Sequence, residues 1–361
     1  MLTSLTDQYR MFSAIVLGLF VLSAAAAGNL SSEPIFLQPG CELVFADTET
    51  GQTILVADDM FTRSISPYLK AATLKTTRPV STKEYLDFLK SQVREWTEQE
   101  KEIVRRAAEA MYPKLSPYHL RLPKKIVLIK TTGKDMLGCA YCRYASIVFP
   151  ESMIYPFGDY FESLLTHELF HVYSRYNLEF RSDLYAVLDF KPCREIELPD
   201  VIARRVVTNP DAPLNDYYVE IPSRNGDLCV MPILLSQYAA YDPNVPDLGM
   251  MAMTDTKLLV LEEKAGQRVC RMENGEPVVL NMADAMGFFT RVGLNTTYVL
   301  GVEEVLAENF TLLIEGQEPL PSPEIVSKVK DFLLGHQTMS DLDDSLEDEK
   351  VTNNNQIPGR L

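Results

Sequence analysis

Histidine, tryptophan and basic residues are scarce in this chain. Among its 361 residues are four histidines and one tryptophan, and 34 lysines and arginines stand against 50 aspartates and glutamates. The resulting formal net charge of -16 argues against a protein that binds nucleic acid or an anionic membrane through a basic face. No internal repeat is apparent. Beyond residue 28 no stretch is long and apolar enough to cross a bilayer, so the sequence predicts no further membrane segment.

The first 28 residues contain the one long apolar run. Arg10 precedes the largely apolar segment Met11–Leu22, and small residues follow from Ser23 to Gly28. This order is typical of a secretory signal peptide, so we predict a signal over residues 1–28 and a secreted, periplasmic or otherwise extracytoplasmic protein. Retention of the segment as an N-terminal anchor is the alternative, because the run approaches spanning length when the alanines are counted.

The rest of the chain has the composition of a globular protein. Hydrophobic residues make up 46% of the sequence, enough to bury a substantial core, which we place in residues 33–338. Residues 339–361 are rich in acidic residues and asparagine and contain few apolar ones. We predict that this tail is disordered.

Six cysteines are spread through the exported part of the chain: Cys41, Cys139, Cys142, Cys193, Cys229 and Cys270. In an oxidising compartment an even number predicts two or three disulfides, whose connectivity the sequence does not specify. Cys139 and Cys142 form a C-x-x-C motif without the second pair of a zinc ribbon. We interpret this motif as structural, with a redox or metal role as the alternative.

The stretch from Asp159 to Tyr176 contains two of the four histidines. It has no glycine or proline, and its apolar residues recur at helical spacing, which predicts a helix. His167 and His171 are four positions apart and therefore lie on one face of that helix, where both imidazoles can reach one metal ion. Glu168 follows the first histidine, where a general base could act on a water molecule at that ion.

These residues form an HExxH motif, and the chain here resembles the zincin metallopeptidases. The resemblance implies zinc as cofactor, a peptide or protein substrate, and an α+β fold in which a mixed sheet packs on the motif helix. Apolar runs at 126–129 and 146–149 precede the motif and predict two strands of that sheet. In zincins an edge strand of the sheet commonly pairs with extended substrate.

Two histidines do not complete a zinc site, which usually takes three protein ligands. The metzincin continuation is absent, because Ser174 and Asn177 occupy the positions of its glycine and third histidine. The segment 304–308 resembles the second ligand helix of gluzincins, with Glu304 as ligand and Glu308 as an acceptor for a histidine N–H. Glu195 and Glu197, soon after the motif, are the competing ligands.

Helices and strands are also predicted for the segments outside the motif. Residues 33–80 are predicted to be β-rich, with a hairpin whose strands at 42–46 and 52–56 flank Gly51. Two capping boxes, at Ser81 and Thr97, predict one long or two consecutive helices over 82–112, ended by Pro113. Within 181–338 we expect cleft-forming loops at 190–199 and 207–213, strands at 217–221, 229–235, 258–262 and 277–280, and helices at 283–292 and 302–314.

The resemblance implies hydrolysis of a peptide bond, with Glu168 accepting the proton of water and passing it to the leaving amine. A phenol commonly helps to hold the oxyanion, and the available tyrosines are Tyr185, Tyr217, Tyr218 and Tyr298. The rival hypothesis is a secreted binding or structural protein of zincin-like fold without catalysis.

Overall fold

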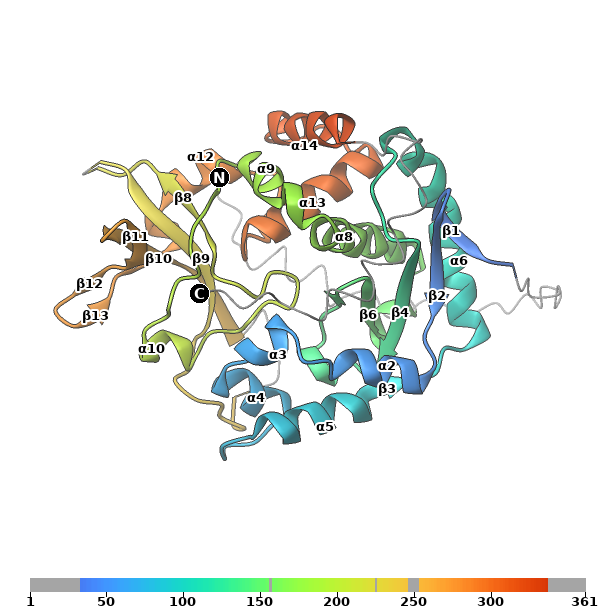
Figure 1. Cartoon of the computed structure of the whole chain (residues 1–361), viewed down its shortest axis with the longest axis horizontal. Helices are drawn as coiled ribbons and strands as arrows, with labels where there is room; N and C mark the ends of the chain where they lie inside the picture. Colours follow the sequence, from blue (N-terminus) through green and yellow to red (C-terminus); the bar gives the residue numbers. More distant parts are fainter. Residues whose placement is uncertain (1–32, 156–157, 225, 246–252, 337–361) are drawn as a thin grey trace, which may run out of the picture. The chain divides into compact units, whose positions relative to one another are not determined.

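The computed structural model describes residues 33–155, 158–224, 226–245 and 253–336. The predicted signal over 1–28 and the acidic tail over 339–361 lie outside the described residues. The described residues from Pro34 to His336 belong to one unit (Figure 1). Within the described ranges, none of the helices combines the length and the apolar character that a membrane span requires.

The first sheet is mixed and has the strand order β1-β2-β4-β6-β5. Strands β2, β4 and β6 are parallel, whereas β1 and β5 lie antiparallel at the two ends and β3 pairs antiparallel with β4. The strand bounds are Ile35–Gln38 (β1), Cys41–Phe45 (β2), Val93–Arg94 (β3), Lys125–Thr131 (β4), Tyr141–Arg143 (β5) and Ser146–Pro150 (β6). The strands predicted at 126–129 and 146–149 are therefore confirmed.

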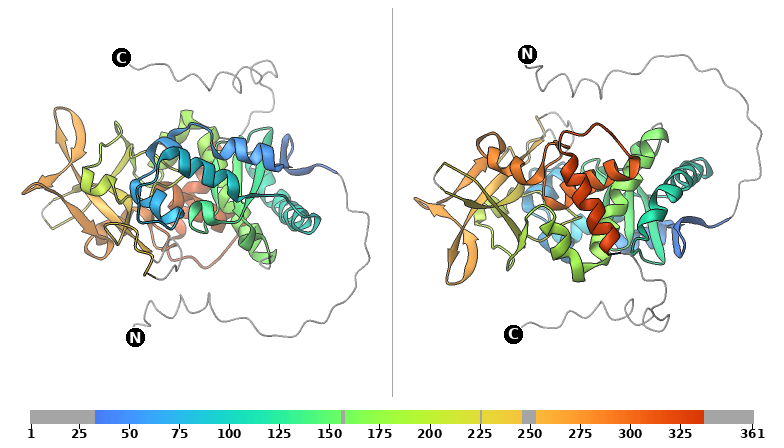
Figure 2. Two further views of the ribbon diagram at one scale, coloured as in Figure 1. Left: turned by 90° about the horizontal axis from the view of Figure 1, so that it is seen from below. Right: turned by 90° about the horizontal axis from the view of Figure 1, so that it is seen from above.

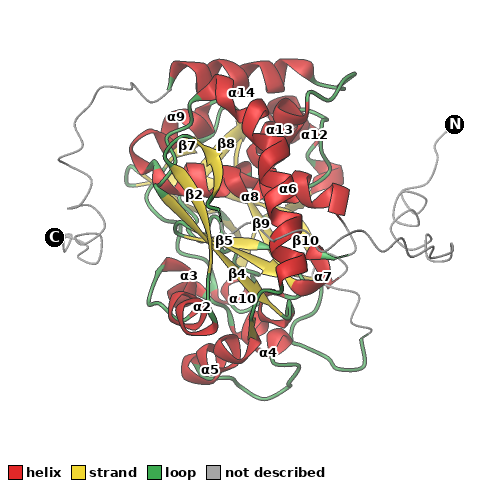
Figure 3. Ribbon diagram, turned by 90° about the vertical axis from the view of Figure 1, so that its right-hand side faces the viewer, coloured by secondary structure: helices red, strands yellow, loops and turns green. Residues whose placement is uncertain are grey.

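Helices cover both faces of this sheet (Figure 3). Along β4, Ile126 and Leu128 belong to the core shared with the motif helix, whereas Ile129 belongs to a second core on the opposite face. Alternate residues of the strand are thus apolar towards both faces, as expected for parallel strands buried between two helical layers. This arrangement confirms the α+β class with a mixed sheet.

The segment 33–80 is only partly β, which corrects the sequence prediction. Strands β1 and β2 do form a hairpin, but residues 52–55, where a strand was expected, belong to a helix, and Val56 follows its end. Asp47 caps that helix by accepting a hydrogen bond from the backbone N of Thr50, at 2.8 Å. Three short helices fill this region: Thr48–Leu55 (α2), Met60–Ser64 (α3) and Pro67–Thr73 (α4).

Gly51, which was predicted to be a turn residue, instead brings α2 close to the sheet. A Cβ placed on Gly51 would lie 2.9 Å from Cγ1 of Val93, and only glycine permits this approach without a shift of the strand.

Residues 82–112 form two helices, Thr82–Gln92 (α5) and Glu98–Leu115 (α6), and both predicted capping boxes are present. Glu84 accepts from the backbone N of Ser81 at 3.0 Å, and Glu100 accepts from that of Thr97 at 2.7 Å. Pro113 does not end α6, which continues to Leu115. Pro113 removes one backbone hydrogen bond to the preceding turn, and the last two residues of α6 remain helical after it.

The motif helix α8 spans Gly158–Tyr176 and packs against α6, β5, β6 and α13. Helix α13 spans Val302–Glu315, ends at Gly316 in the left-handed conformation, and packs between α8 and α14, Pro323–Gly335 (Figure 1). The predicted helices at the motif and at 302–314 are confirmed. Shorter helices occupy Glu151–Ile154 (α7), Arg181–Ala186 (α9), Asp200–Ala203 (α10) and Met286–Val292 (α12).

A second sheet lies on the other side of α8 from β1 and β2 (Figures 1 and 2). It is antiparallel, in the order β11-β10-β9-β8-β7, with β14 also paired to β10. Its strands are Lys191–Pro192 (β7), Tyr217–Ile221 (β8), Leu228–Ser236 (β9), Thr254–Lys264 (β10), Gln267–Cys270 (β11) and Val279–Asn281 (β14). A separate two-stranded ribbon joins Met272–Glu273 (β12) to Glu276–Pro277 (β13).

All six cysteines are free thiols, so the predicted disulfides are absent from the described residues. Cys41 is enclosed in the core beside α6, where burial raises the pKa of its thiol to about 12. Cys142 donates to the backbone carbonyl of Glu168 at 3.2 Å, and Cys229 and Cys270 face Leu261 from the two strands that flank β10. Cys41 and Cys142 belong to the main core and Cys139 packs against the second core, whereas Cys193, Cys229 and Cys270 share the core of the antiparallel sheet.

Candidate metal centre

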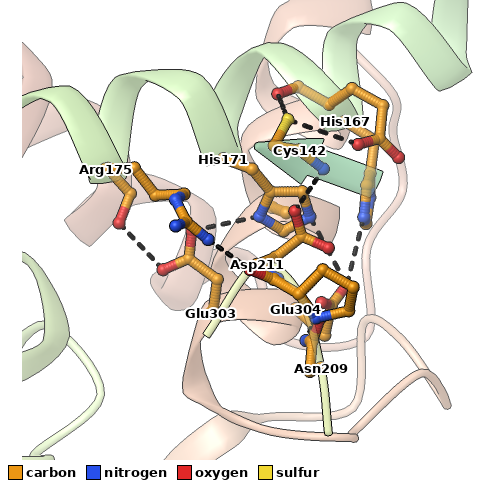
Figure 4. Close-up of polar contacts among 12 residues, drawn as sticks. Cys142, His167, His171, Arg175, Asn209, Asp211, Glu303 and Glu304 are labelled. Carbon is orange, nitrogen blue, oxygen red and sulfur yellow. Dashed lines mark hydrogen bonds and ion pairs between the residues drawn. The ribbon is translucent and has the colours of Figure 1, made fainter. Parts of the chain in front are cut away.

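Helix α8 presents His167 and His171 to the interior, with ring centroids 4.8 Å apart (Figure 4). The side chain of His171 is 1% exposed and that of His167 is 13% exposed. The spacing of four residues places both rings on one face of the helix, as the sequence predicts.

Glu304 comes to the same point from helix α13, although it lies 137 residues after His167 in the sequence. Its Oε2 is 3.2 Å from Nε2 of His167 and 3.6 Å from Nε2 of His171. Its Oε1 accepts from Nδ2 of Asn209 at 2.5 Å. The ligand atoms of the two histidines and Glu304 all lie within 4.8 Å of one another. The structure thus brings together the three residues that the sequence analysis favoured as ligands.

Each imidazole directs Nε2 towards Glu304 and Nδ1 towards a different glutamate. Nδ1 of His167 is 3.1 Å from Oε1 of Glu308, in agreement with the position predicted for that residue. Nδ1 of His171 is 3.0 Å from Oε1 of Glu303, which the sequence analysis did not consider. A carboxylate on Nδ1 fixes the tautomer that leaves Nε2 free to bind a metal.

Glu303 is itself held by a buried network. Its Oε2 accepts from Oγ of Ser174 at 2.8 Å and from the hydroxyl of Tyr185, whose oxygen in turn accepts from Nε of Arg181 at 3.0 Å. The sequence signal that could have revealed Glu303 is its place beside Glu304 in the first turn of α13, where the helix dipole favours carboxylates.

The electrostatics of the cluster favour a cation. Burial raises the pKa of Glu304, but the two histidines outweigh this effect and the pKa ends well below its usual value. Burial lowers the pKa of His167, but hydrogen bonds to Glu304 and Glu308 outweigh it and raise the pKa to about 9. Together with buried Glu168 and Asp211, carboxylates outnumber imidazoles, so a divalent cation would offset the excess negative charge. Two imidazoles and one carboxylate are also a donor set that suits zinc.

Glu168 lies beside the three candidate ligands and is 3% exposed. Burial, and then the nearby charge of Asp211, raise the pKa of Glu168 to about 7. The thiol of Cys142 lies 3.5 Å from Oε2 of Glu168, and Oδ1 of Asp211 accepts from the backbone N of Cys142 at 2.6 Å. Cys142, Glu168 and Asp211 form a second buried group with ligand-type atoms within 4.8 Å of one another.

The loop at 207–213 forms one wall of the centre, in agreement with its predicted role. Thr208 donates to the carbonyl of Ser64 at 2.9 Å, and the backbone N of Asp211 donates to Oδ1 of Asn209 at 2.9 Å. Arg175 donates to the carbonyl of Pro210. These bonds fix the loop so that Asn209 and Asp211 both point into the site (Figure 4).

A cavity of about 40 Å³ adjoins the centre and is lined by both histidines, Glu168, Glu304 and Tyr298. Of the four tyrosines named above, Tyr298 lies here, with its ring centroid 6.1 Å from that of His167. The other three have different partners. The hydroxyl of Tyr185 donates to Glu303, the hydroxyls of Tyr217 and Ser182 are 3.0 Å apart, and the guanidinium of Arg268 lies over the ring of Tyr218.

The competing ligands lie elsewhere. Glu195 and Glu197 are exposed and line a larger neighbouring cavity, outside the group formed by the histidines and Glu304. The segment that carries them lies between β7 and α10, and neither glutamate lines the small cavity at the centre.

Comparison with known proteins gave no match to a family model, to a curated protein or to a solved structure.

Proposed function

We propose that this chain is a zinc-dependent peptidase of the HExxH type, with a gluzincin-like ligand set of His167, His171 and Glu304. The observation that carries the proposal is the orientation of the two imidazoles. Both direct Nε2 at one carboxylate oxygen of Glu304, and both have Nδ1 against a further glutamate. These four contacts are typical of metal-binding histidines, in which one ring nitrogen faces the ion and the other is held by a carboxylate.

A zinc ion held by His167, His171 and Glu304 would supply Lewis-acid chemistry, since bound zinc lowers the pKa of water and polarises a carbonyl group. Glu168 acts as the general base, accepting a proton from the attacking water and giving it to the leaving amine. Its raised pKa of about 7 suits a group that must both take up and release a proton near neutral pH.

Tyr298 is the residue that we assign to the oxyanion. It lines the same small cavity as His167 and Glu168, and its hydroxyl has no hydrogen-bond partner among the described residues. A phenol that is free to donate can bind the negative charge that develops on the substrate carbonyl.

Strand β5 offers a place for an extended peptide. It lies at the edge of the first sheet, next to β6, and Cys139, Ala140 and Tyr141 line the small cavity. A peptide added to β5 as a further strand would carry the scissile bond past the centre, and it would have to replace Asp211 as the partner of the backbone N of Cys142.

The proposal includes export of the protein through the predicted signal over residues 1–28. Its rival is a binding or structural protein of similar fold that does not hydrolyse peptides. The test that separates them measures metal content by elemental analysis and cleavage of a peptide library, for the wild type and for Glu168→Gln. We expect about one zinc per chain in both proteins and cleavage by the wild type alone. Bound zinc without any cleavage would favour the rival, and no zinc uptake would reject both the metal site and the peptidase.

A further inference from the structure

A second, larger cavity lies next to the metal centre. It has a volume of about 510 Å³ and is bounded by the 190–199 loop, the 207–217 segment, strand β9 and the start of α13. Five residues line both this cavity and the small one at the centre: Val207, Thr208, Asn209, Leu234 and Leu300. A group held in the larger cavity therefore lies one residue layer from Glu304.

Arg181 is the buried cation of this cavity. It is 8% exposed, and its guanidinium carbon lies 5.0 Å from the ring centroid of Tyr185 and 5.7 Å from that of Tyr217. Nε donates to the hydroxyl of Tyr185 at 3.0 Å, whereas the two terminal nitrogens donate to no described residue. The terminal nitrogens are not among the fully enclosed atoms that lack a partner, and Arg181 lines the cavity, so a ligand or water there can supply the acceptors that a guanidinium requires.

The acidic residues around Arg181 do not take this role. Glu303 already accepts from Ser174 and Tyr185 and faces His171. Asp216 forms no ion pair with Arg181 among the described residues; burial raises the pKa of its carboxyl group, and the nearby charge of Arg181 opposes that rise. Glu195 and Glu197 are exposed at the wall of the cavity. Glu303 and Asp216 thus offset part of the charge of Arg181, but no acidic side chain among the described residues accepts from its terminal nitrogens, which stay available to a ligand.

The cavity also selects the kind of anion. Its remaining lining is largely apolar and includes Phe190, Leu198 and Met231. The terminal nitrogens of one arginine match the two oxygens of one carboxylate. The carboxylates of Glu195 and Glu197 repel any anion, but they repel a phosphate dianion about twice as strongly as a singly charged carboxylate.

We propose that the larger cavity is a substrate-recognition pocket and that Arg181 binds a carboxylate of the peptide in it. The carboxylate comes either from an aspartate or glutamate side chain or from the C-terminus of the substrate. The inference rests on the proposed peptidase function for its meaning, but binding in the pocket requires neither zinc nor turnover.

The test therefore uses the full chain after removal of metal with a chelator, so that no carboxylate can bind to zinc. Calorimetric titration compares two pairs of probes. Acetyl-glutamate α-amide against acetyl-glutamine amide reports a side-chain carboxylate, and acetyl-leucine against acetyl-leucine amide reports a terminal one. We expect the acid of one pair to bind at least about tenfold more tightly than its amide, as one charged hydrogen-bonded contact provides.

Arg181→Met should abolish this preference, whereas Arg194→Met, which removes an exposed arginine of the same cavity, should change it less than about twofold. Tyr185→Phe is the second control. It removes the hydroxyl that links Arg181 to Glu303 and keeps the guanidinium of Arg181. It should retain the preference for the acid. If Arg181→Met does not fold, Arg181→Lys replaces it and should weaken acid binding, since lysine lacks the planar fork.

Equal binding of acid and amide in both pairs, or an unchanged preference in a folded Arg181 variant, would overturn the assignment. Loss of the preference in Tyr185→Phe to the same degree as in Arg181→Met would also overturn it, because Arg181 would then act only through Tyr185 and Glu303. None of these results depends on whether the loaded protein cleaves peptides.

Discussion

Oε1 of Glu303 lies 3.0 Å from Nδ1 of His171, and both side chains are 1% exposed. A buried carboxylate in this position holds the imidazole in one tautomer and makes it a stronger ligand.

We expect Glu303→Gln to weaken zinc binding by about 10- to 100-fold, because the amide keeps the shape and removes the charge. Competition with a chromogenic chelator measures the affinity. Glu308→Gln should have a smaller effect, since the Glu308 side chain is 36% exposed and its field on His167 is screened by water. Glu315→Gln, at the opposite end of α13, is the matched control. The assignment fails if Glu303→Gln behaves like that control.

The third ligand can be tested by metal content. Glu304→Ala should lose bound zinc and all turnover, because two histidines alone form an open and labile site. Glu195→Ala and Glu197→Ala should keep their zinc, since both residues lie outside the ligand group. Zinc retained by Glu304→Ala and lost from either of the other two variants would move the ligand to the loop after β7.

Tyr298→Phe isolates the proposed oxyanion donor. We expect kcat to fall by about 100- to 1000-fold with little change in KM, because the hydroxyl contacts charge that develops in the transition state. Zinc affinity should be unaffected, which distinguishes this variant from Glu304→Ala. A variant with wild-type kcat would leave the oxyanion to another group.

We expect the stability of the fold to depend on a buried ion pair outside the candidate ligand group. Arg143 is fully buried, and its Nε and NH2 lie 2.8 Å and 2.6 Å from Oδ2 of Asp59. We expect Arg143→Met to lower the free energy of unfolding by about 3–5 kcal/mol, because Asp59 is left buried without a counter-charge. Urea denaturation measures the change. Lys83→Met, which breaks the exposed pair with Asp87, is the control and should have no measurable effect. A loss in Arg143→Met no larger than in this control would contradict the role of the pair.

The motif helix could be predicted because helix formation, burial and ligand spacing all depend on residues within one short segment. Glu304 could be named because two carboxylates spaced four apart on an apolar helix are costly without a partner. Its meeting with His167 depends on the packing of α13 against α8, which residue spacing does not specify. Glu303 was missed for the same reason, since it faces His171 only after the two helices are packed.

The predicted hairpin at 42–56 failed because a short apolar run is compatible with both a strand and a buried helix. Apolar and polar residues do not alternate regularly over Thr53–Val56, so this pattern does not favour a strand. The N-cap at Asp47 starts a helix just before the run, and the run continues that helix. The close contact of Gly51 with Val93 then fixes α2 against the sheet, through a residue distant in sequence.

All strands of the antiparallel sheet lie in the sequence between α8, which carries the two histidines, and α13, which carries Glu304. Helix α13 then packs against α8. A cation held by both helices would join the two ends of this segment, whose closure costs an unfolded chain considerable entropy. Part of the free energy of metal binding would then stabilise the packing of the second sheet against the first. Zinc would act as a removable cross-link, and the resistance of the folded chain to unfolding and proteolysis would follow the supply of the ion.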